Sequence, residues 1–71
     1  MKCKIKYSHY ANGSTYYFVD LAFDGHMLRP VGCFPYRSNK CAMIFNTKTD
    51  ANKVAKYLRS LGCSYVRVLP A

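Results

Sequence analysis

The chain has 71 residues, with 11 Lys+Arg against 3 Asp+Glu and a formal net charge of +8. Its length predicts one domain, 1–71, and its hydrophobic content of 51% is too high for a disordered tail. The apolar runs are shorter than the roughly 18 residues of a membrane span, and no apolar stretch of a signal peptide follows the first lysines. We therefore expect a cytoplasmic protein with no membrane partner, whose charge favours a polyanion.

The first predicted strand, residues 2–10, alternates basic and apolar side chains. The basic residues are Lys2, Lys4 and Lys6. Because successive side chains of a strand point to opposite faces, the three lysines are expected to form one row. Such a row could contact a phosphate backbone, or it could protect an edge strand from pairing with another chain.

The Asn12-Gly13 pair predicts a hairpin that leads into a second strand over 15–23. We expect a three-residue loop with a bulge there, because that register keeps the lysines off the apolar face. The same register would leave Tyr16 and Phe18 exposed on the face opposite the helix. Exposed aromatic rings beside lysines are suited to single-stranded nucleic acid or to a protein interface.

A second turn is predicted at Asp24-Gly25, with Asp20 opposite Arg29. The third strand is short, about 26–31, and Pro30 marks it as an edge strand or as the end of pairing.

Residues 32–40 are expected to be a loop, and the apolar run 41–45 to be a central strand. Apolar residues at helical spacing from Ala51 to Leu61 predict an amphipathic helix, with Thr47 as its N-cap and Gly62 just after its end. Residues 64–69 form the last predicted strand.

The predicted element order is therefore β-β-β-β-α-β. This order indicates an α+β fold, with a small, mostly antiparallel sheet of four to five strands and one helix packed on one face. The last three elements would form a right-handed βαβ unit. A single helix covers only one face of such a sheet, so the other face is free for water or a partner.

Two further groups of basic residues are candidates for binding. The helix group is Lys48, Lys53, Lys56 and Arg59, and the loop group is Tyr36, Arg37 and Lys40. The helix residues could equally form an ordinary solvated face, and the loop aromatics could cover the end of the sheet. In a chain with so few acids, we interpret both groups as parts of a surface for nucleic acid.

Residues capable of catalysis or metal binding show no recognisable spacing. The four cysteines, Cys3, Cys33, Cys41 and Cys63, contain no C-x-x-C pair, and free thiols are the preferred interpretation over two disulfides or a metal site. No histidine has a spaced partner, and the glycines occupy predicted turns and a helix end rather than a phosphate-binding loop. The sequence predicts no enzyme and no cofactor.

The stretch Phe45-Asn46-Thr47-Lys48-Thr49-Asp50-Ala51 resembles the strand-to-helix junction of the three-stranded DNA-binding domains at the N-termini of phage-type integrases. The likeness covers about 30 residues with the preceding hairpin, and similar junctions occur in peptidoglycan-binding modules. It implies a DNA partner, whereas the additional strand 64–69 departs from that pattern.

The leading hypothesis from the sequence is a small non-enzymatic module that docks on nucleic acid or a nucleoprotein. A second hypothesis is an inhibitor or adaptor that binds a protein, as mobile-element-encoded anti-defence proteins such as anti-CRISPR proteins do. A third is a homodimer formed through the uncovered sheet face or an edge strand.

Overall fold

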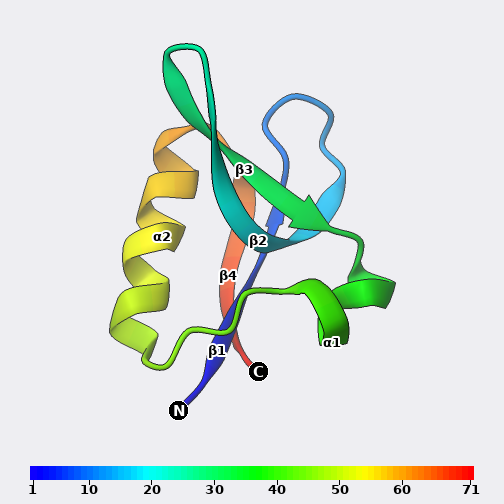
Figure 1. Ribbon diagram of the computed structural model, residues 1–71, viewed down its shortest axis with the longest axis vertical. Coiled ribbons are helices and arrows are strands. Elements are labelled where there is room, and N and C mark those ends of the chain that lie inside the picture. The colour runs from blue at the N-terminus through cyan, green and yellow to red at the C-terminus, as the bar shows by residue number, and fades with distance from the viewer.

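A computed structural model describes the backbone of residues 1–71 and all side chains except those of Ser38 and Asn39. The chain forms one antiparallel sheet of four strands in the order β3-β2-β1-β4, with the long helix α2 on one side (Figure 1). The elements are β1 (Cys3–Ser8), β2 (Thr15–Asp24), β3 (Met27–Cys33), the 3-10 turn η1 (Pro35–Arg37), α1 (Ser38–Cys41), α2 (Lys48–Ser60) and β4 (Ser64–Pro70). The predicted α+β class, with one helix packed on the sheet, is confirmed.

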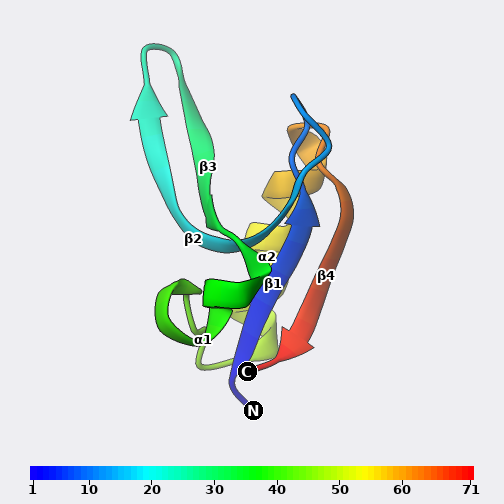
Figure 2. The same ribbon diagram turned by 90° about the vertical axis from the view of Figure 1, so that its right-hand side faces the viewer.

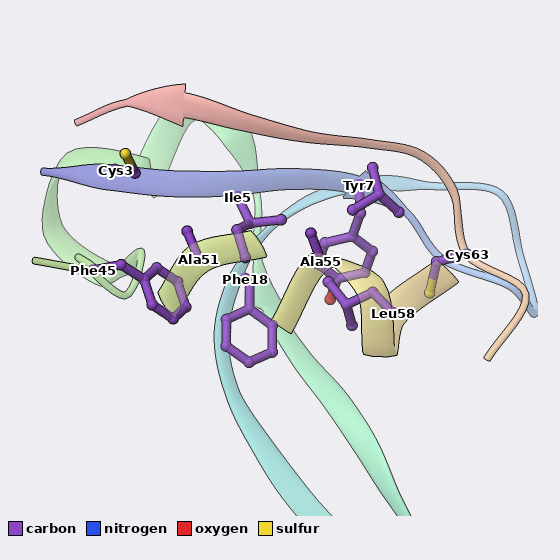
Figure 3. Packing of buried hydrophobic residues seen from close by; sticks show 10 residues of the cluster. Cys3, Ile5, Tyr7, Phe18, Phe45, Ala51, Ala55, Leu58 and Cys63 are labelled. Carbon is purple, nitrogen blue, oxygen red and sulfur yellow. The ribbon is translucent and has the colours of Figure 1, made fainter. Parts of the chain in front are cut away.

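The core lies between β1 and α2, as Figure 3 shows. Ile5 and Tyr7 of β1 are 0% and 1% exposed, and they point toward Ala55 and Leu58 of α2, which are both 0% exposed. The helix also reaches the far strand, because the Tyr57 hydroxyl donates a hydrogen bond of 3.1 Å to the Leu28 carbonyl of β3. One face of the sheet is thus covered by the helix.

Helix α2 begins and ends where the sequence predicts. The Thr47 hydroxyl accepts from the Asp50 backbone N–H at 3.2 Å, as an N-cap does. At the other end Gly62 has φ +97°, and the N–H groups of Gly62 and Cys63 donate to the carbonyls of Arg59 and Leu58. This pair of bonds is a Schellman motif, which turns the chain toward β4.

The predicted register between the first two strands is wrong. Tyr7 pairs with Tyr16 and Lys6 with Tyr17, across a loop closed by a hydrogen bond from His9 N–H to the Ser14 carbonyl. Tyr16 therefore lies half-buried on the helix side, and Phe18, expected to be exposed, is a core residue with 2% exposure. A loop longer than expected moved the pairing, and a shift of one residue exchanges the two faces.

Strand β2 bends sharply at a bulge between Phe18 and Asp20, so its second half leaves β1 and pairs only with β3. The resulting β2–β3 arm projects from the rest of the molecule (Figure 2). The turn of this arm is one residue later than predicted, because Asp24 pairs with Met27. Arg29 therefore lies opposite Ala22 and not, as predicted, opposite Asp20. Its guanidinium forms an ion pair of 3.0 Å with Asp24. Pro30 does lie on an edge strand.

Residues 41–45 do not form the predicted strand, and no βαβ unit results. Cys41 ends the short helix α1, and only Phe45 pairs with β1, through two backbone hydrogen bonds with Cys3. Phe45 occupies the place beside Cys3 that β2 leaves when it bends away. Only part of this apolar run is buried: the Phe45 side chain lies in the core at 8% exposure, whereas those of Met43 and Ile44 are 37% and 47% exposed.

We predict that Gly32→Ala lowers the free energy of unfolding by about 1–3 kcal/mol. A Cβ at Gly32 would lie 2.5 Å from the Tyr7 hydroxyl and 2.6 Å from the Tyr16 Cβ. Urea unfolding followed by circular dichroism measures the change. Combining it with Tyr7→Phe should recover only part of the loss, because the Tyr16 Cβ remains in place. An unchanged unfolding midpoint for Gly32→Ala would contradict this packing.

Candidate nucleic-acid interface

The face of the sheet away from α2 carries the lysine row of β1. Lys4 and Lys6 alternate with the buried Cys3, Ile5 and Tyr7, as the sequence predicts. The Lys4 ammonium lies 4.9 Å from the centre of the Tyr17 ring on β2, within reach of a cation–π interaction. Because β1 is paired with β2 on one edge and β4 on the other, the lysines are not there to protect an edge strand.

Two cations face each other directly on this surface. Lys6 of β1 pairs in register with Arg67 of β4, and Lys4 pairs with Leu69. Neither β1 nor β4 contains an Asp or Glu. Like charges directly opposite each other destabilise a sheet, so this arrangement concentrates positive potential at some cost in stability.

The same face contains an open groove of about 530 Å³ along β1 and β4. Its lining includes Lys6, Ser8, Thr15, Tyr65 and Arg67. The groove therefore combines two cations with hydroxyl-bearing residues and the exposed ring of Tyr65, and it has no acidic lining residue. Cations for phosphates and a ring for a base are what a nucleic-acid surface requires.

Tyr65 lies at a bulge in β4. Between the pairs Lys6–Arg67 and Ser8–Ser64, β4 has one residue more than β1. Tyr65 has φ +51° in this bulge and is 76% exposed, while its neighbour Val66 is buried in the core at 8%. Tyr65 and Val66 thus point to opposite sides of β4, as successive residues of a strand do, and Tyr65 shares the face of Arg67.

The basic residues of α2 do not join this surface. Lys48, Lys53 and Lys56 are exposed on the helix, which covers the opposite face of the sheet. The Arg59 guanidinium donates to the Val66 carbonyl at 2.9 Å, so it is engaged with the backbone of edge strand β4. One flat ligand cannot contact the helix cations and the β1 lysines at the same time.

The predicted loop residues form a separate small site. Tyr36 is 81% exposed and stacks on Phe34, with ring centres 5.8 Å apart and an angle of 7° between the planes. A depression of about 480 Å³ is lined by Tyr36, Arg37, Lys40 and Cys41. Phe34 also contacts Tyr16, with ring centres 5.6 Å apart, so Tyr16 supports this loop rather than the lysine face.

Sequence reasoning missed three residues of the candidate interface: Tyr17, Tyr65 and Arg67. Arg67 could have been found, because it lies between Val66 and Val68 and so belongs to the face opposite the core. The wrong register placed Tyr17 on the helix side of the sheet, whereas it pairs with Lys6 on the lysine face. The same alternation along β4 places Tyr65, two residues before Arg67, on that face, whereas its left-handed backbone is not signalled by a local pattern.

The thiols are free, as expected, and buried to different degrees. Burial raises the pKa of Cys63, and burial together with the adjacent Cys41 raises that of Cys33. Both thiols are therefore protonated at neutral pH and are not activated nucleophiles. In the described part of the chain, no three His, Cys, Asp or Glu side chains gather as metal ligands, and no described helix is long and apolar enough to cross a membrane.

Comparisons of the chain with protein-family models, curated proteins and solved structures gave no match. The geometry of its own residues is therefore the basis for a functional proposal.

We predict that Lys6→Gln or Arg67→Gln raises the free energy of unfolding of the free protein by about 0.2–1 kcal/mol at low salt, because each removes a cross-strand repulsion. The gain should shrink as salt screens the charges. Lys53→Gln is the control, since Lys53 lies one helical turn from Asp50 and should give no gain. Urea titrations at low and high salt measure both; a loss of stability in Lys6→Gln would contradict the repulsion.

Proposed function

We propose that the protein is a small non-enzymatic module that docks on nucleic acid, alone or within a nucleoprotein, through the uncovered face of its sheet. The observation that carries this proposal is the direct pairing of Lys6 on β1 with Arg67 on β4, two neighbouring strands that contain no acid. A phosphate placed between the two cations would turn their repulsion into two favourable contacts.

The neighbouring residues extend the same surface. Lys4 lies next to Lys6 along the row, held over the Tyr17 ring. Successive lysines of a strand on one face are about 6.6 Å apart, roughly two phosphate spacings of one strand of a duplex. The row and Arg67 therefore offer cations at intervals that a phosphate backbone can follow, which supports contact without dependence on base sequence.

We predict that the protein binds a fluorescein-labelled DNA oligonucleotide at low salt, and that log affinity falls with log salt with a slope of about −2 to −3. That slope corresponds to three phosphates neutralised by Lys4, Lys6 and Arg67 at roughly 0.7–0.9 each. Fluorescence anisotropy over a salt series measures it. Lys6→Gln and Arg67→Gln should each weaken binding and reduce the steepness by about one unit.

The matched control is Arg29→Gln, which changes the net charge by the same amount but alters the β2–β3 arm, where Arg29 is paired with Asp24. Its affinity and salt slope should equal those of the unmodified protein. No binding at low salt, or equal losses in all three variants, would contradict a site on this face.

A protein partner is the competing outcome, and a pull-down from lysate separates the two. Retained material that disappears after nuclease treatment supports the proposal. One protein retained at full yield after nuclease, and lost in Lys6→Gln, would instead assign the face to a protein.

A further inference from the structure

Tyr65 has a backbone conformation that is unfavourable for its side chain. Its φ of +51° lies in the left-handed region, which costs an L-residue with a Cβ free energy and is rare for bulky residues. In a β-bulge with a left-handed residue, that position is usually occupied by glycine. The other left-handed residues of this chain are Gly13, Gly25 and Gly62. The formation of the bulge alone does not explain why this position carries a tyrosine instead of a glycine.

The Tyr65 ring contributes little to the fold. It is 76% exposed, whereas the core contact of the bulge is made by Val66. Among the side chains that the structure describes, no aromatic ring stacks on Tyr65 and no cation lies over it, in contrast to Tyr17, whose ring holds the Lys4 ammonium. Tyr65 thus presents an unoccupied aromatic face in the groove, next to Lys6 and Arg67.

We infer that the groove binds single-stranded nucleic acid, with one base stacked on the Tyr65 ring and the adjoining phosphates on Lys6 and Arg67. This inference rests on the proposed function and specifies its ligand. In a duplex the base faces are already stacked inside the helix, so an exposed ring on a protein surface has no base to receive. A single strand offers unstacked bases, and every base has a face that can stack.

The strained backbone at Tyr65 also points to a binding site. Local strain persists at positions where the surrounding structure holds it, and it gathers at binding and catalytic sites. Here the pairing of Lys6 with Arg67 on one side of the bulge and Ser8 with Ser64 on the other holds Tyr65 in place. The backbone that carries the ring is therefore fixed before the ligand arrives, which reduces the entropy lost on binding.

The test uses the full chain and one labelled oligonucleotide of about 12 nucleotides, alone and annealed to its complement, at one salt concentration. We expect the single strand to bind about tenfold more tightly than the duplex. Tyr65→Ala should weaken single-strand binding by about 5- to 150-fold and leave duplex binding within about twofold. Tyr65→Phe, which keeps the ring, should bind as the unmodified protein does.

A second variant separates stacking from folding. Tyr65→Asn replaces the ring by a residue that accepts a positive φ more readily, so it should unfold at a higher urea concentration and still lose single-strand affinity. The control is Phe23→Ala: Phe23 is also exposed, at 71%, but lies on the β2–β3 arm. Its binding should be unchanged.

The outcomes distinguish the two proposals. If single strand and duplex bind equally, and Tyr65→Ala has no selective effect, the inference is overturned while nucleic-acid docking stands. If neither probe binds, both are overturned. Loss of single-strand binding in Tyr65→Ala and Tyr65→Asn, with retention in Tyr65→Phe, supports stacking on the ring.

Discussion

The pairing of β1 on both of its edges is the constraint on which the rest of the structure depends. With β2 on one side and β4 on the other, the strand cannot rotate, and its alternation of apolar and basic residues separates two environments. Ile5 and Tyr7 must face α2, and Lys4 and Lys6 must face away from it. The core and the cationic face are therefore two consequences of one strand.

Both neighbours of β1 contain a bulge, and each bulge has a consequence for the surface. The bulge in β2 lets the strand leave β1 and become the projecting arm, while Phe45 takes its place beside Cys3. The bulge in β4 adds one residue between the pairs Lys6–Arg67 and Ser8–Ser64, and Tyr65 within it lines the groove with a left-handed backbone. Bulges bend a strand and change the direction of its side chains without ending the sheet. In this sheet of four strands, the two bulges are where the strand pairing departs from a regular register.

The charge distribution lowers the stability of the fold, and the burial of a small core has to offset this loss. Asp20 and Asp24 lie on β2, which forms the arm, and Asp50 lies in the first turn of α2, so no acid remains on β1 or β4 to offset Lys6 and Arg67. Tyr65 adds backbone strain at the same place. A chain of this size buries only about 60% of its unfolded surface, so small unfavourable terms matter. Their concentration in one groove is consistent with the proposed binding site, since binding surfaces often sacrifice stability.

The hydrophobic and helical parts of the fold could be predicted because residues close in sequence determine them. Thr47 caps the helix through Asp50, three residues away, and Gly62 ends it through bonds within one turn. The alternation in β1 likewise needs no partner to be recognised. These local features were enough to predict the α+β class and the lysines of the cationic face.

The amino-acid sequence alone determined which residues of β1 are apolar and which are basic, where α2 begins and ends, and how little acid offsets the charge. The tertiary structure decided the registers of both hairpins, the fate of residues 41–45, and the position of Tyr65 beside Lys6 and Arg67. Register and bulges result from competition between distant segments for one core, and a shift of a single residue exchanges the faces of a strand. No local pattern contains that information.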